Sequence, residues 1–249
     1  MLISARKNAI FQLMLNRPEK RNSLHPDLIS ALAQTLTQIG KDDSVNVVIL
    51  TGAGPSFCAG LDLIHLLSLD AEARVAYMQT FFELLQQLYA HPQPIIAVVN
   101  GPAIAGGFDL AALCDLRLCS PEATFAQTEV LLGITQIMYP IYKVIGLGRA
   151  KELALTGEAI SAEEAHRIGL VNRIYPSSEL LDQALKLADT IASRPRQALF
   201  ATRQLSRELI DMNTGSAFKR MFEVISERLR SEEHRQEAKR YVVQLKQRR

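Results

Sequence analysis

Two carboxylate residues in apolar surroundings are the positions of this sequence best suited to chemistry. Asp109 follows the glycine pair Gly106-Gly107, and Glu129 ends the mostly apolar segment 125–129. An ionised side chain in such surroundings is costly to bury without a partner. Acids retained in such places often serve proton transfer. The pair therefore predicts an enzyme rather than a scaffold.

Two glycine-bearing loops, residues 52–60 and 100–107, precede candidate binding groups. Each follows an expected buried strand, and the second opens an expected helix, where free N–H groups bind anionic oxygens. If the strands are parallel neighbours, the N–H groups near Leu61 and at Gly106 can point to one carbonyl oxygen and form an oxyanion hole. Asp109 lies one helical turn beyond Gly106, which places its carboxylate within reach of the same site.

Each of these features also has a simpler explanation. The loop 52–60 fits a β-to-α turn that only needs glycine conformations; it has Phe57 where the dinucleotide fingerprint requires glycine. Asp109 fits the solvent face of an amphipathic helix, although its neighbours leave little polar face. Glu129 fits a surface position at a helix start. The three cysteines lack a CxxC pair and the five histidines lack ligand spacing, so we expect no metal site.

The elements that must position these residues alternate between strand and helix patterns. Apolar runs predict strands over residues 9–15, 45–51, 95–99 and 115–119, and helical spacing predicts helices over 26–39, 71–89 and 106–113. Ser161-Ala162-Glu163-Glu164 forms a capping box that opens a short helix. Helical patterns then cover residues 178–193, 195–211 and 214–247. We expect an α/β core over residues 1–193 and a C-terminal helical region over 194–249.

Composition limits the class of protein. The chain has 249 residues, 48% hydrophobic and 22% charged, with a formal net charge of +2. This near-neutral net charge does not indicate a basic surface for nucleic acid. No apolar run approaches the roughly 18 residues needed to span a bilayer. The first seven residues lack the order of a secretory signal, and three unpaired cysteines fit a reducing compartment. We therefore expect a cytoplasmic protein without membrane or nucleic-acid partners.

Taken together, these motifs resemble the crotonase superfamily, the enoyl-CoA hydratases and isomerases. The matches keep their order along nearly the whole chain, and they fall on residues 15–24, 48–52, 57–63, 99–107, 114–115, 125–129, 155–157 and 169–171. The resemblance implies a spiral of repeated ββα units with a C-terminal helical region that mediates trimerisation. It also implies a homotrimer or a hexamer built as a dimer of trimers.

The resemblance further implies an acyl-CoA substrate, whose coenzyme A belongs to the substrate, and no separate cofactor. The thioester oxygen would bind the N–H groups of Leu61 and Gly106, and the two hydratase glutamates fall on Asp109 and Glu129. The predicted coenzyme A contacts are Ala59, Asp62, Leu63 and Ile64. The predicted acyl pocket includes Ile137 and Met138.

Two departures from the family pattern affect the expected reaction. Asp109 is one methylene shorter than the hydratase glutamate, and aspartate at this position resembles the dienoyl-CoA isomerase branch. That branch carries a third acid where this chain has Ile137. The usual Pro-Gly-rich stretch after Gly133 is replaced by residues 134–140.

Hydration of a 2-enoyl-CoA is the leading prediction, with Glu129 as the principal acid–base group and Asp109 positioning water. An enoyl-CoA or dienoyl-CoA isomerase is the alternative, and a non-catalytic RNA- or CoA-binding protein is a third.

Overall fold

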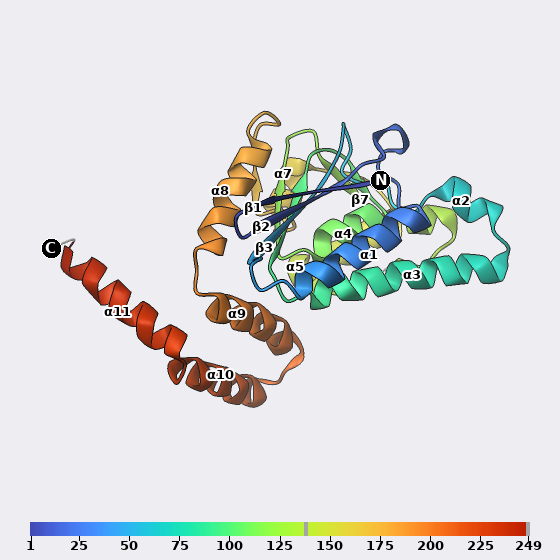
Figure 1. Ribbon diagram of the computed structural model, residues 1–249. Coiled ribbons are helices and arrows are strands. Elements are labelled where there is room, and N and C mark those ends of the chain that lie inside the picture. Colours follow the sequence, from blue (N-terminus) through green and yellow to red (C-terminus); the bar gives the residue numbers. More distant parts are fainter. Residues whose placement is uncertain (137–138, 248–249) are drawn as a thin grey trace. The chain divides into compact units, whose positions relative to one another are not determined.

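The computed structural model describes residues 1–136 and 139–247 and divides the chain into two compact units, Met1–Asp189 and Thr190–Arg249. The first unit is built on a six-stranded sheet in the order β1-β2-β3-β4-β6-β9. β1 and β2 are antiparallel, and all later neighbours in this sheet are parallel (Figure 1). The strands of the sheet are β1 Leu2–Lys7, β2 Ile10–Leu15, β3 Val47–Gly52, β4 Ile95–Val99, β6 Leu116–Cys119 and β9 Arg173–Ile174.

The central strands are continuous apolar runs because helices cover the sheet of a parallel α/β core. Every residue of β3 and β4 is buried. These two strands are parallel neighbours, so their carboxyl ends lie at the same edge of the sheet. The loops that carry Leu61 and Gly106 begin at that edge.

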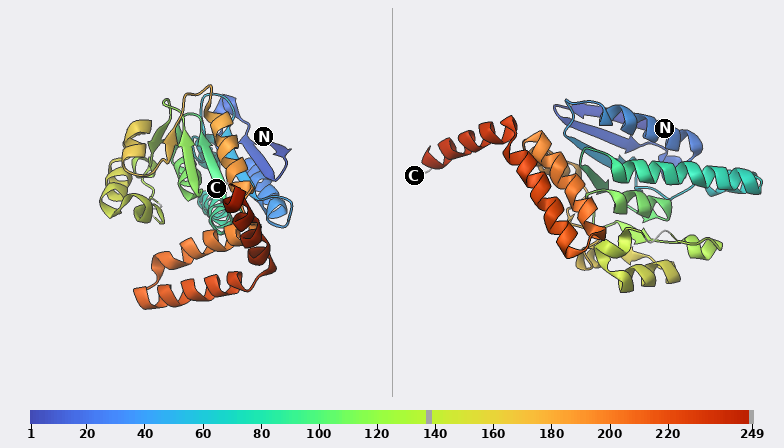
Figure 2. Two further views of the ribbon diagram at one scale, coloured as in Figure 1. Left: turned by 90° about the vertical axis from the view of Figure 1, so that its left-hand side faces the viewer. Right: turned by 90° about the horizontal axis from the view of Figure 1, so that it is seen from below.

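Helices of the first unit pack on this sheet and beside one another. α1, α3 and α4 run side by side in both sets of views (Figures 1 and 2), and α3 contacts both α1 and α4. The helical elements up to the end of this unit are η1 Pro18–Lys20, α1 Pro26–Gly40, α2 Leu63–Ser68, α3 Ala71–Ala90, α4 Gly106–Leu113, η2 Glu129–Leu132, α5 Ile141–Ile145, α6 Leu147–Thr156, α7 Ala162–Arg167 and α8 Leu180–Ala192, whose last three residues fall in the second unit.

A second, three-stranded sheet supports the candidate site from another direction. Its order is β5-β7-β8, and its strands are β5 Ala103–Ile104, β7 Thr124–Ala126 and β8 Ile160–Ser161. β5 leads into α4, which carries Asp109, and β7 leads into η2, which begins at Glu129. The parallel pairing of β5 with β7 therefore brings the two acid-bearing segments together.

The second unit is helical, with α9 Arg196–Glu208, η3 Leu209–Asp211, α10 Thr214–Leu229 and α11 Glu232–Gln247. The helical pattern over residues 214–247 forms two helices rather than one. Ser231 interrupts it: its Oγ accepts a hydrogen bond from the N–H of His234 at 3.2 Å and caps the start of α11. A capping serine starts a new helix because it satisfies a backbone donor that the helix itself leaves free. Within the part of the chain that the structure describes, no helix combines the length and apolar character needed to cross a bilayer.

Candidate active site

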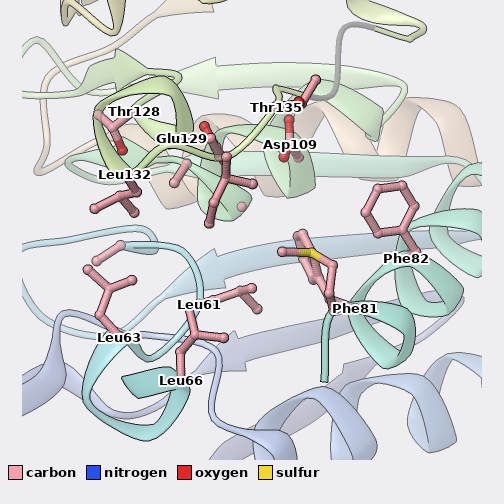
Figure 3. Close-up of a pocket in the computed structure, with 15 residues that line it drawn as sticks. Leu61, Leu63, Leu66, Phe81, Phe82, Asp109, Thr128, Glu129, Leu132 and Thr135 are labelled. Atoms are coloured by element: carbon pink, nitrogen blue, oxygen red, sulfur yellow. The ribbon is translucent and has the colours of Figure 1, made fainter. Parts of the chain in front are cut away.

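Asp109 and Glu129 face one cavity of about 360 Å³ (Figure 3). Asp109 lies in the first turn of α4 and is only 1% exposed, whereas Glu129 is the first residue of η2 and is half-buried. Leu61, Leu63 and Leu66 lie across the cavity from the two acids. The structure therefore brings together the two acids that the sequence singled out.

The electrostatic environment of the two acids favours their protonated forms. Burial raises the pKa of Asp109 well above its ordinary value, and the nearby charge of Glu129 raises it further. Burial also raises the pKa of Glu129. The Oδ2 atom of Asp109 and the Oε2 atom of Glu129 are buried and have no hydrogen-bond partner among the described residues. Both acids line one cavity, and a buried oxygen without a partner is a group that can accept a hydrogen bond or a proton there.

Two side-chain amides contact the Asp109 carboxyl group. The Nε2 atom of Gln136 donates a hydrogen bond to Oδ1 of Asp109 at 3.3 Å. The side chain of Gln127, which is fully buried at the end of β7, also bonds to Asp109. Both hydrogen bonds lower the pKa of Asp109 and oppose the effect of burial.

The loops that carry Leu61 and Gly106 are in backbone contact. The N–H of Ile104 donates to the carbonyl of Cys58 at 2.9 Å. Gly60 adopts a φ of +85°, and a Cβ atom there would lie 3.0 Å from the carbonyl oxygen of Ile104 and 3.1 Å from the nitrogen of Gly106. Only glycine combines this φ with so close an approach.

This contact places two backbone donors at the same cavity. Leu61 and Gly106 both line the cavity that Asp109 and Glu129 face. Neither of their N–H groups donates a hydrogen bond to another residue in the described part of the chain. Donors that are fixed in place and unengaged match the requirement of an oxyanion hole.

Backbone strain is visible at Ala105, the residue that precedes the second donor, Gly106.

 Ala105 has φ 52° and ψ −126°, a conformation that residues other than glycine rarely adopt. Its own N–H donates to the carbonyl of Ala126 at 2.8 Å, which ties the loop to β7. The torsion ψ of Ala105 sets the orientation of the peptide group that carries the N–H of Gly106. Strain of this kind costs on the order of 1–3 kcal/mol and persists only where the surrounding structure holds it.

The other predicted contact residues divide into three groups. Ala59 and Leu63 line the cavity. Asp62 and Ile64 do not: Ile64 is 75% exposed, and the carboxylate of Asp62 accepts hydrogen bonds from the guanidinium of Arg17 at 3.1 Å and from the N–H of His65. Asp62 thus caps α2 and joins it to the turn after β2. Ile137 and Met138 lie outside the described residues, so their predicted place in the acyl pocket stays a prediction.

Several cavity residues were not identified from the sequence. Met78, Phe81 and Phe82 of α3 supply an apolar wall. The apolar spacing of residues 71–89 predicts the helix but does not tell which of its side chains face a cavity rather than the core. Gln127 and Gln136 were also missed as partners of Asp109, because their local sequence gives no sign of a contact with a residue far along the chain. No group of three or more His, Cys, Asp or Glu side chains within residues 1–136 and 139–247 is placed to hold a metal ion.

Comparisons with known proteins agree with this architecture. The sequence pattern of the enoyl-CoA hydratase/isomerase family matches residues 5–248. The chain is 36% identical over 214 residues to the crotonyl-CoA hydratase of Syntrophomonas wolfei, with 83% of this chain and 81% of that protein covered. It is also 34% identical over 223 residues to the short-chain-enoyl-CoA hydratase of Clostridium acetobutylicum, covering 87% of this chain and 85% of that one.

Solved structures of the same class superimpose closely. The enoyl-CoA hydratase of Bacillus anthracis matches with a TM-score of 0.90 and 31% identity, covering 93% of this chain and 92% of that chain. The α/β, crotonase-like fold with a C-terminal helical region is confirmed. On the sequence match, the relatives and the fold together, the chain belongs to the enoyl-CoA hydratase/isomerase family.

Proposed function

We propose that this protein is an enoyl-CoA hydratase that adds water across the 2,3 double bond of a 2-enoyl-CoA thioester. The observation that carries the proposal is a single cavity lined by two residues with unengaged backbone N–H groups and by two acids that each have an unpartnered oxygen. The relatives named as hydratases of crotonyl-CoA and short-chain enoyl-CoA support the same reaction.

In the proposed mechanism, the N–H groups of Leu61 and Gly106 bind the thioester oxygen. Attack of water at C3 moves an electron pair onto this oxygen and forms an enolate, which the two donors stabilise. Removal of one such donor commonly raises the activation free energy by about 3 kcal/mol. This charge development is the reason why the donors accelerate the reaction rather than merely bind the substrate.

The two acids manage the protons of the added water. The charge of Glu129 raises the pKa of Asp109, so the mechanism assigns the carboxylate to Glu129 and the proton to Asp109. Glu129 accepts a proton from water as the oxygen attacks C3, while Asp109 positions the water. A proton from the pair is then delivered to C2, which completes the addition of one water molecule.

The cavity wall suggests the kind of acyl group that fits. Among the described lining residues, Asp109 and Glu129 are the only charged ones, and the rest of the wall is mostly apolar. A second carboxylate at the end of the acyl chain would be buried there without a cation. We expect unbranched apolar 2-enoyl-CoA substrates to be hydrated at least about tenfold more efficiently than a dehydroadipyl-CoA.

The function is tested by incubating the purified protein with crotonyl-CoA and longer 2-enoyl-CoA thioesters in ¹⁸O-labelled water. Hydration removes the enoyl absorbance and places one labelled oxygen at C3. An isomerase would instead convert a 3-enoyl- or dienoyl-CoA into its 2-enoyl isomer without labelled oxygen in the product. Asp109→Asn and Glu129→Gln should each lose activity; full hydration by Asp109→Asn would remove Asp109 from the mechanism.

The assembly is also a proposal: a homotrimer or a dimer of trimers. It is supported by an apolar stripe on α10, where Phe218, Phe222, Ile225 and Leu229 are each at least half exposed and recur at helical spacing. Exposed apolar faces of this size commonly mark protein interfaces.

A further inference from the structure

We infer that Gln136 is a positioning residue for the reaction and that it acts through the Asp109 carboxyl group. The inference rests on the proposed function, because it concerns how that acid is held for catalysis. Gln136 directly follows Ile134 and Thr135, which line the cavity. Its side chain supplies the hydrogen bond to Oδ1 of Asp109 described above.

The geometry separates the two oxygens of Asp109 by role. Oδ1 accepts the Gln136 amide at 3.3 Å, whereas Oδ2 is buried without a partner among the described residues. An amide donor on one oxygen fixes the rotation of the carboxyl group and leaves the other oxygen for water.

Gln136 acts on the acid rather than on the substrate. Its neighbours Ile134 and Thr135 line the cavity, but Gln136 is not among the cavity-lining residues. Gln136 therefore acts on the substrate only through Asp109. Because an N–H donor stabilises the ionised carboxylate, loss of the amide must raise the pKa of Asp109.

The test replaces Gln136 with Met, which has a similar length and shape but no donor, and with Glu, which adds a like charge. The matched control is Gln79→Met, because the Gln79 amide on the exposed face of α3 also donates to a carboxylate, that of Glu83 at 3.1 Å. We expect kcat to fall about 10- to 100-fold in Gln136→Met, with KM little changed. The pH-rate profile should move to higher pH in Gln136→Met and further in Gln136→Glu, and should not move in the control.

A second readout does not depend on activity. In protein labelled with ¹³C at the aspartate carboxyl carbons, the signal of Asp109 is identified by its loss in Asp109→Asn. Its titration midpoint should rise from the wild type to Gln136→Met and rise again in Gln136→Glu. An unchanged midpoint in both variants would overturn the inference, whether or not the enzyme hydrates enoyl-CoA. A wild-type protein that hydrates no enoyl-CoA would instead overturn the proposed function alone.

Discussion

At Asp109, burial opposes ionisation, because the side chain is 1% exposed and its pKa is raised well above the ordinary value. Below the ordinary pKa, Asp109 is protonated in both the native and the unfolded chain, so its ionisation does not affect stability. As the pH rises above that value, the unfolded chain ionises first and the native state loses stability. The acid is therefore retained at a cost to the fold.

Asp109→Asn is accordingly expected to raise the free energy of unfolding at neutral pH by on the order of 1 kcal/mol, while activity falls. The gain over the wild type should shrink as the pH drops toward the ordinary pKa of aspartate. Urea unfolding between pH 4 and about pH 8 measures this dependence. Asp182→Asn, on the exposed side of α8, is the control. A gain that does not vary with pH would contradict the raised pKa of Asp109.

Glu129→Gln tests the coupling between the two acids. Burial is the largest cause of the raised pKa of Asp109, and the charge of Glu129 is the second. Removing that charge should lower the pKa of Asp109 but leave it above the ordinary value. Carboxyl ¹³C titration measures the change; a midpoint that stays the same or rises in Glu129→Gln would show that the acids do not interact as the structure indicates.

At the scale of elements, the site depends on how closely two loops approach each other. Gly60→Ala would place a Cβ atom against Ile104, Ala105 and Gly106 in a backbone conformation that alanine avoids. We expect a loss of about 1–3 kcal/mol in the free energy of unfolding and a drop in kcat as the two N–H groups separate.

The matched control for this variant is Gly148→Ala. Gly148 lies near the start of α6, its φ is not positive, and a Cβ atom there would meet no atom within 4 Å. This variant should keep full activity and at least the stability of the wild type. Thermal unfolding and steady-state kinetics of both variants make the comparison; equal behaviour of the two would contradict a strict need for glycine at position 60.

Strongly patterned elements were predicted from the sequence. The buried run 95–99 is β4 and the segment 106–113 is α4, since continuous apolar and helical patterns reflect burial directly. The edge strand β1 and the two-residue strands β5, β8 and β9 were missed. Such strands are too short or too exposed to produce a periodic pattern, and their pairing depends on neighbours far along the chain.

The site residues divide in the same way, into those with a local sequence signal and those whose contacts lie far along the chain. Turns that need glycine and acids in apolar segments are visible locally, which is why Asp109 and Glu129 were found. The carboxylate of Asp62 could not be placed in advance, because its partner Arg17 lies 45 residues away in the chain. The contact between Gln136 and Asp109 was hidden for the same reason.

At the scale of the whole molecule, the division into two units separates chemistry from the proposed assembly. The described residues that line the active-site cavity belong to Met1–Asp189, and the α10 stripe belongs to Thr190–Arg249. In α11, Arg235 pairs with Glu232 and Arg240 with Glu237. Basic side chains that are interleaved and paired with acids favour a solvated helix face over a site for RNA.

Phe222→Glu tests the assembly by placing a charge in the centre of the α10 stripe. We expect the wild type to have at least three times the chain mass of 27.7 kDa by light scattering, and the variant to have a smaller mass. Ser216→Glu, on the other side of α10 by helical spacing, should leave the mass unchanged. A monomeric wild type would contradict the proposed trimer.

The central claim is that two backbone donors hold a thioester oxygen within reach of two acids. A crystal structure of the protein with a bound 2-enoyl-CoA or 3-hydroxyacyl-CoA measures this arrangement directly. The account predicts the thioester oxygen at about 2.7–3.2 Å from the backbone nitrogens of both Leu61 and Gly106, with C3 facing Asp109 and Glu129. A thioester bound elsewhere, or with its oxygen turned away from both nitrogens, would contradict it.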